Sequence, residues 1–208
     1  MSGFTGDPLW QQPAQSYNIA AMAEAAVQQD AAALIDRVAG IAGGRDRLHI
    51  APLDTLHLSL YGVAPVRSRF DKDAYWADVQ SIVLQVLRDW AARQAVSTLR
   101  FRSLKATSAA VIAVAEPHDG IWALRAALAA ALPPPPGGAP KYDLIHMTLA
   151  RYAQPQALPS DFAARIAALP VALEYPLRQV ILMKETQYPS LGFETLETQA
   201  LRAPEMIA

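Results

Sequence analysis

Two tetrapeptides in the chain have matching residue types that could carry out acid–base chemistry. They are HLSL at residues 57–60 and HMTL at residues 146–149, each a histidine, an apolar residue, a hydroxyl residue and a leucine. A histidine side chain has an unperturbed pKa of about 6.5, so its ring can accept or donate a proton near neutral pH. A hydroxyl two positions along can donate a hydrogen bond to an anion between the two rings.

Both tetrapeptides have the pattern of a β-strand. Side chains alternate between the two faces of a strand, so each histidine shares a face with its hydroxyl, while the two apolar residues share the other. One face can line a site while the other packs into a core. The sequence contains four histidines, and two such matches among them have a chance probability on the order of one in a hundred.

Such a pair of histidines fits the in-line cleavage of a phosphodiester. This reaction needs a base on the attacking oxygen and an acid on the leaving oxygen, on opposite sides of phosphorus. His57 and His146 are the candidates for these catalytic roles, and the sequence leaves open which is the base. Ser59 and Thr148 are the candidates for phosphate binding, because their hydroxyls can donate to the non-bridging oxygens. No metal and no other cofactor is expected.

The elements that must position these residues follow from hydrophobic periodicity and turn residues. Residues 1–16 are expected to form an irregular N-terminal arm, and 17–208 a single domain. The expected helices cover residues 19–41, 71–92, 119–132 and 160–168. The expected strands cover 56–63, 96–104, 107–115, 143–152, 171–174, 177–186 and 193–201. A Pro-Gly tract at 133–138 is expected to be an exposed connector.

The order of these elements is partly repeated. Each tetrapeptide strand is followed by a connector, a helix and at least two strands, which indicates weak internal duplication. We therefore expect an α+β fold with two pseudo-symmetric lobes, each with an antiparallel sheet and flanking helices. The active cleft is expected between the lobes, where the two tetrapeptide strands meet.

Composition excludes several classes of function. The chain has 208 residues and no cysteine, so disulfides, thiolate metal ligands and a cysteine nucleophile are excluded. With a net charge of −1, the chain lacks the excess of basic residues that is typical of proteins that bind a long nucleic acid. No apolar run reaches the roughly 20 residues of a membrane span. We expect a cytoplasmic protein, a monomer, with no membrane contact.

The two tetrapeptides and their surroundings resemble the 2H phosphoesterases, which include bacterial 2′-5′ RNA ligase-like proteins and cyclic nucleotide phosphodiesterases. LHLSLYG at residues 56–62 and IHMTLAR at residues 145–151 are similar to the two motif strands of that family. Residues 178–201 are similar to its usual ending. The resemblance implies a bilobal fold and a metal-independent phosphodiesterase. It also implies a substrate with a 2′,3′-cyclic phosphate or a 2′-5′ linkage, on a small nucleotide or an RNA end.

Three further residues are candidates for substrate contact. Tyr61 shares strand parity with His57 and Ser59, so it can line the cleft or simply pack. Arg151 has the opposite parity to His146, so it needs a bulge or a strand end to reach the site. The case for Tyr188, in the loop before the last strand, rests mainly on the resemblance.

Two other interpretations stay open. Two histidines can bind a metal ion, but neither tetrapeptide has a third histidine or carboxylate at ligand spacing, and the nearest carboxylate, Asp143, lies on the other strand face. The protein can also be a binding module that recognises a phosphorylated nucleotide without turning it over. His49 and His118 lack a following hydroxyl and are expected to be structural.

Overall fold

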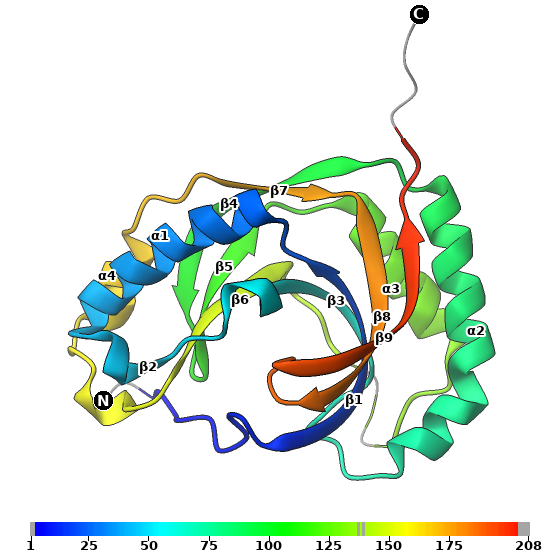
Figure 1. Cartoon of the computed structure of the whole chain (residues 1–208), viewed down its shortest axis with the longest axis horizontal. Coiled ribbons are helices and arrows are strands. Elements are labelled where there is room, and N and C mark those ends of the chain that lie inside the picture. The colour runs from blue at the N-terminus through cyan, green and yellow to red at the C-terminus, as the bar shows by residue number, and fades with distance from the viewer. Residues whose placement is uncertain (1–2, 137, 139, 204–208) are drawn as a thin grey trace, which may run out of the picture.

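The computed structural model describes residues 3–136, 138 and 140–203, which form a curled sheet with helices on its outside (Figure 1). The strands are β1 (Pro13–Met22), β2 (Leu48–His49), β3 (His57–Ala64), β4 (Ser97–Ala106), β5 (Ala110–Ala115), β6 (His146–Tyr152), β7 (Leu173–Leu177), β8 (Gln179–Gln187) and β9 (Gly192–Ala200). The helices are α1 (Ala25–Ala42), α2 (Lys72–Arg93), α3 (Asp119–Ala131) and α4 (Phe162–Ala167), with short 3-10 turns at Arg45–Arg47, Leu53–Thr55 and Pro155–Ala157. The α+β class is confirmed.

One sheet runs through the molecule. Its strand order is β7-β4-β5-β6-β3-β1-β8-β9, and β2 pairs with the free part of β6. Helices α1 and α4 pack on the half that contains β4, β6 and β7, whereas α2 and α3 pack on the half that contains β1, β3 and β9. Strands β3 and β6, which carry the two tetrapeptides, are therefore neighbours where the two halves meet (Figure 1).

The structure differs from the expected arrangement of lobes in two respects. The halves share a single sheet rather than having one each. They are also interwoven along the chain, because α2 follows β3 on one half while β4 and β5 cross to the other. The repeated order of elements in the sequence therefore does not correspond to two consecutive lobes.

The N-terminal expectations are wrong in part. The irregular arm ends at Gln12 rather than at residue 16, and β1 occupies Pro13–Met22, where the sequence analysis placed the start of a helix. Strand β1 lies between β3 and β8, and its residues Ile19 and Ala20 are fully buried. A segment rich in alanine, isoleucine and methionine has no clear polar–apolar alternation, so its sequence does not distinguish a buried strand from a helix. Pairing with β3 and β8 on its two edges makes this segment a strand.

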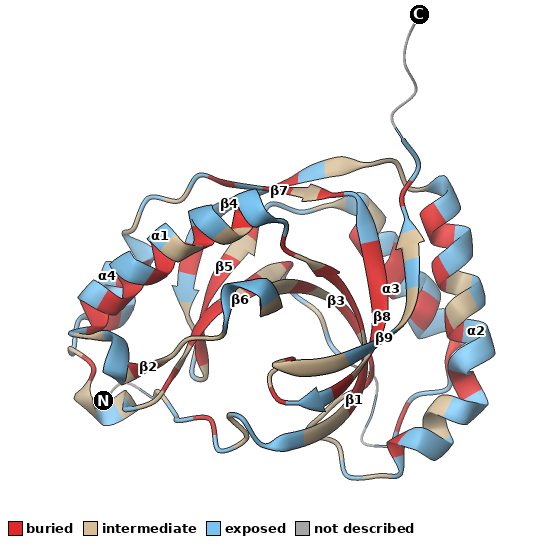
Figure 2. Cartoon of the chain, viewed as in Figure 1, coloured by how far each residue is buried: buried red, intermediate tan, exposed pale blue. Residues whose placement is uncertain are grey.

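Local signals explain the helices that were predicted well. Asp71 caps α2 by accepting a hydrogen bond from the backbone N–H of Ala74 at 3.0 Å. Gly43 ends α1 at φ 90°, a left-handed conformation that glycine adopts without steric cost. The inward faces of the helices are buried against the sheet (Figure 2). In the described residues of the Pro-Gly tract, 133–136 and 138, the chain forms no helix or strand; Gly137 lies outside the described residues.

No helix in the described part of the chain has both the length and the apolar character needed to cross a bilayer.

Candidate active site

The structure brings the four tetrapeptide residues to one pocket. Strands β3 and β6 pair through Leu58 and Met147, the apolar residues that follow the two histidines, and both are fully buried. The opposite faces of the same strands direct His57, Ser59, His146 and Thr148 to the pocket. Because Leu58 and Met147 occupy equivalent positions in the two tetrapeptides, their pairing places His57 and His146 on adjacent strands. Both histidine side chains line the same pocket.

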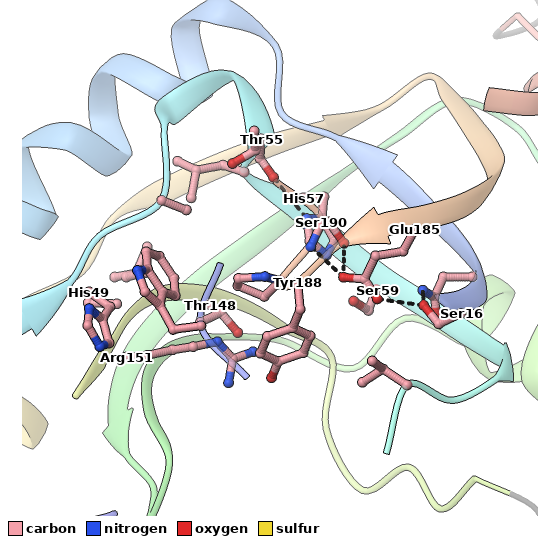
Figure 3. Close-up of a pocket in the computed structure, with 18 of the residues that line it drawn as sticks. Ser16, His49, Thr55, His57, Ser59, Thr148, Arg151, Glu185, Tyr188 and Ser190 are labelled. Atoms are coloured by element: carbon pink, nitrogen blue, oxygen red, sulfur yellow. Dashed lines mark hydrogen bonds between the residues drawn. The ribbon is translucent and has the colours of Figure 1, made fainter. Parts of the chain in front are cut away.

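The pocket has a volume of about 240 Å³. Figure 3 shows Thr148, Arg151 and Tyr188 on one side of it and Ser59, Glu185 and Ser16 on the other. The lining residues come from both halves of the sheet, from the N-terminal segment and from the β8–β9 turn. They include Trp10, Ser16, Asn18, His49, Thr55, His57, Ser59, Pro65, Val66, His146, Thr148, Arg151, Glu185, Tyr188 and Ser190.

Each motif strand has a β-bulge at the leucine that ends its tetrapeptide. Residues Thr148 and Ala150 pair with consecutive residues of β5, so Leu149 is an extra residue that reverses the side-chain alternation. Arg151 therefore shares the pocket face with His146, and it lines the pocket. The bulge required for Arg151 is present.

The same kind of bulge removes Tyr61 from the site. Residues Ser59 and Tyr61 pair with consecutive residues of β1, so Leu60 is the extra residue in β3. Tyr61 consequently points into the core, where it is 3% exposed and contacts the ring of Tyr142 at 5.5 Å. It is not among the residues that line the pocket. Of the two roles that the sequence leaves open for Tyr61, the structure therefore supports packing, because the bulge reverses the strand parity.

A backbone hydrogen bond sets the orientation of His57. Its Nδ1 donates to the carbonyl oxygen of Thr55 at 2.9 Å, which leaves Nε2 as the nitrogen that can exchange a proton with a ligand. Burial lowers the pKa of His57 below the usual value for histidine, and the Arg151 charge acts in the same direction. The Thr55 carbonyl and the Glu185 carboxylate oppose this shift in pKa by stabilising the protonated ring.

His146 has a more cationic environment. Burial is the main cause that lowers its pKa, and the charges of Arg125, His57 and Arg151 lower the pKa further. The carboxylate of Asp143 raises the pKa of His146 and partly opposes these effects. The two histidines therefore differ in what surrounds them, although both have a lowered pKa.

Arg125 is an important residue that sequence reasoning missed. It lies on α3, is 4% exposed, and its Nε and Nη1 donate to the carbonyl oxygens of Leu60 and Leu144, both at 2.9 Å. Its Nη2 donates to the carbonyl of Ser59 at 3.4 Å. A bulge leaves backbone groups outside the regular ladder, so Arg125 holds the bulged segment of β3 behind the face that lines the pocket. An arginine in an alanine-rich helix gave no signal of this contact.

Glu185 is a second missed residue, buried at 3% exposure in the pocket wall. The hydroxyl of Ser16 donates to its Oε2 at 2.6 Å, and the N–H of Ser190 donates to Oε1. Asn18 in turn donates to the Ser16 hydroxyl at 2.6 Å. Figure 3 shows Glu185 between His57 and Ser16. A single carboxylate in a hydrophobic strand has no motif that would identify it in the sequence.

Tyr188 lies at the site, as the resemblance implies. It lines the pocket, the guanidinium carbon of Arg151 is 4.9 Å from its ring centroid, and the peptide bond before Pro189 is cis. Burial raises the pKa of Tyr188 above the usual value for tyrosine, so its hydroxyl is protonated. That hydroxyl donates to the carboxylate of Asp7 at 3.0 Å.

The two other histidines have different environments. His118 is structural: it caps α3 by accepting from the N–H of Ile121, and Ser97 bonds its other ring nitrogen at 2.9 Å. His49 instead lines the pocket and stacks on Trp10, with ring centroids 4.7 Å apart and an angle of 8° between the rings. His49 therefore belongs to the site surroundings, contrary to the sequence expectation. In the described residues, no group of three or more His, Cys, Asp or Glu is arranged to hold a metal ion.

Comparisons with known proteins agree with this arrangement. The sequence model of the 2′-5′ RNA ligase superfamily matches residues 24–189. The structure of TT0787 from Thermus thermophilus is 22% identical with a TM-score of 0.63, over 90% of this chain and 98% of that one. Escherichia coli LigT complexed with 3′-AMP is 16% identical with a TM-score of 0.59, over 91% and 98% of the two chains. LigT complexed with ATP is 18% identical with a TM-score of 0.57, over 90% and 98%.

No curated protein sequence matches the chain. At the identities of the solved structures, their likeness shows the fold, whereas the superfamily model matches most of the sequence, including both tetrapeptides. That membership supports a phosphoesterase-type activity. The chain therefore belongs to the 2′-5′ RNA ligase superfamily, the group of 2H phosphoesterases that its paired tetrapeptides resemble.

Proposed function

We propose that this protein is a metal-independent phosphodiesterase for a 2′,3′-cyclic phosphate or a 2′-5′ linkage at the end of a nucleotide or RNA. The observation that carries the proposal is the pairing of β3 and β6 through Leu58 and Met147. This pairing presents two histidines and two hydroxyls to a single pocket.

The four side chains match the needs of in-line displacement at phosphorus. One histidine removes a proton from water or a ribose hydroxyl as its oxygen attacks, and the other protonates the oxygen that leaves. Ser59 and Thr148 donate hydrogen bonds to the non-bridging oxygens, where negative charge builds in the transition state. Every proton is then supplied or accepted by the protein's own side chains.

The surroundings of the two rings support an assignment of their roles in hydrolysis. The ring whose protonated form is better stabilised holds the proton at the start and acts as the acid. Burial and the Arg151 charge favour the neutral form of both rings. The Thr55 carbonyl and Glu185 favour protonated His57, and Asp143 favours protonated His146. Arg125 and protonated His57 add two charges that favour a neutral His146. We assign His57 as the general acid and His146 as the general base.

The size of the pocket favours a small substrate or a chain end. Its volume of about 240 Å³ is below the roughly 300 to 1,000 Å³ of drug-sized ligand pockets. LigT, which has the same fold, has been crystallised with 3′-AMP and with ATP. The net charge of −1 also lacks the basic excess expected of a protein that binds a long RNA through many phosphates.

The test is turnover of 2′,3′-cyclic nucleotides and 2′-5′-linked dinucleotides in the presence of a chelator. We expect product to form, and we expect His57→Ala and His146→Ala each to lower turnover by about two to four orders of magnitude. His118→Asn is the matched control, because His118 caps α3 away from the pocket and asparagine is a good N-cap residue.

Full activity in either motif variant would refute the assignment of the histidines. Activity that the chelator abolishes would refute the metal-independent mechanism. If the wild-type protein binds these nucleotides tightly but forms no product, the protein is a binding module for phosphorylated nucleotides, and the hydrolase proposal fails.

A further inference from the structure

Asp7, in the N-terminal arm, is buried against Arg151 and Tyr188, two residues that line the pocket. Its side chain has no solvent exposure and is bound from three other segments of the chain. Arg151 Nη1 and the Tyr188 hydroxyl donate to its Oδ2 at 2.9 and 3.0 Å. Arg67 Nη2 donates to its Oδ1 at 3.1 Å, as does the backbone N–H of Leu9 at 3.2 Å.

The arm that carries Asp7 is held on both sides of this position. Before it, the N–H of Thr5 donates to the carbonyl of Ser108 at 2.8 Å, and Phe4 packs on the ring of Tyr152 at 4.9 Å. After it, the N–H of Gln11 donates to the carbonyl of Tyr188 at 2.9 Å. The arm therefore bridges the two halves of the sheet and places Asp7 at a defined point. The superfamily match starts at residue 24, after the arm.

The groups that bind Asp7 are those that would bind a phosphate. Two guanidinium groups and a phenolic hydroxyl converge on the carboxylate oxygens, which have the charge and acceptor geometry of phosphate oxygens. Arg151 and Tyr188 also line the pocket that contains the motif residues. The Nε of Arg151 is buried and has no partner in the described residues, so this side chain keeps donor capacity beyond Asp7.

We propose that Asp7 is an internal counter-anion that fills a second anion subsite formed by Arg67, Arg151 and Tyr188. With Asp7 in place, the pocket accepts ligands with one phosphate at the motif residues. Ligands with a second phosphate adjacent to the first are rejected, because that phosphate meets a buried carboxylate. Asp7 is thus a specificity-determining residue for the charge of the substrate. This inference rests on the proposed function, because it requires a ligand that carries a phosphate.

The test compares the binding of inorganic phosphate and of pyrophosphate by calorimetry. Asp7→Asn keeps the shape of the side chain and removes its negative charge, so the net positive charge of the subsite increases by one unit. We expect pyrophosphate to bind Asp7→Asn at least about tenfold more tightly than wild type, the scale of one hydrogen bond to a charged group. Asp89→Asn is the control, because it makes the same charge change on the exposed face of α2.

Two variants of Arg67 make the test specific. In Asp7→Asn, adding Arg67→Gln should remove the gain for pyrophosphate. In the wild-type background Arg67→Gln should change the affinities for phosphate and pyrophosphate by similar factors, because Asp7 already occupies that guanidinium. This variant is informative even if Asp7→Asn does not fold. Arg67 is 57% exposed in its side chain, so it tolerates the change.

Three results would overturn the inference. One is a folded Asp7→Asn protein without a gain for pyrophosphate, and another is an equal gain in Asp89→Asn. The third is a loss of pyrophosphate affinity in Arg67→Gln alone that is at least about tenfold larger than its loss of phosphate affinity, which would mean that Arg67 already contacts the second phosphate. If wild type binds phosphate and one of these results is found, the proposed function stands and the counter-anion inference fails. If no variant, wild type included, binds either anion, both fail.

Discussion

Replacement of Arg125 by methionine should weaken both the fold and the catalytic geometry. Methionine fills most of the volume of the arginine stem but has no donors. The carbonyls of Leu60 and Leu144 would lose their 2.9 Å hydrogen bonds, and Ser59 would lose a weaker one. Because Leu60 is the bulged residue of β3, the segment that carries the hydroxyl of Ser59 would lose its support.

The expected loss of stability follows from these contacts. A hydrogen bond with a charged donor contributes about 1.5 to 3 kcal/mol, so the two short bonds together contribute about 3 to 6 kcal/mol. The guanidinium carbon also lies 4.7 Å from the ring centroid of Trp122 and 4.3 Å from that of Tyr142, which adds about 1 kcal/mol each. Removing a buried cation recovers several kcal/mol of desolvation cost. The net loss in unfolding free energy should be about 2 to 4 kcal/mol.

Urea unfolding and NMR titration test this prediction together. For a chain of this size the loss corresponds to a fall in Tm of roughly 5 to 15 °C. The pKa of His146 should rise, because the Arg125 charge is among the causes that lower it. Arg88→Met is the control: its side chain is 52% exposed and pairs with Glu197 at 3.3 Å, so it should cost less than about 1 kcal/mol.

Two results would refute the reasoning about Arg125. One is an Arg125→Met protein whose unfolding free energy is within about 0.5 kcal/mol of wild type. The other is a folded variant in which the pKa of His146 does not move upward.

Two further predictions concern His57 and His146. Both have a pKa below the unfolded value of about 6.5, so the unfolded chain binds more protons and stability should fall as the pH drops below about 6.5. This contribution is fully present above that pH. The difference in urea midpoint between pH 7.5 and pH 5.5 should shrink in His57→Gln/His146→Gln, and an unchanged difference would contradict this account. Glu185→Gln should lower the pKa of His57 further, because the carboxylate opposes its downward shift. An NMR titration that shows no change, or a rise, would show that Glu185 does not act on this ring.

The sequence by itself determined the paired histidine–hydroxyl pattern and most of the elements. Alternation along a strand is a local property, so it separated His57 and Ser59 from the buried Leu58 without knowledge of the fold. The long helix α2 and the strands from β3 to β9 have clear periodicity or turn boundaries, and each lies within a few residues of its expected range. The two tetrapeptides were also sufficient to indicate the family.

The tertiary structure decided whatever depends on contacts between distant segments. A bulge is set by how two strands pair, so the sequence could not show that Leu60 turns Tyr61 into the core while Leu149 turns Arg151 into the pocket. The contacts of Arg125 with the β3 bulge and of Asp7 with Arg151 join residues 65 and 144 positions apart. No local pattern encodes such contacts, because their stabilisation arises only when folding excludes water from both partners.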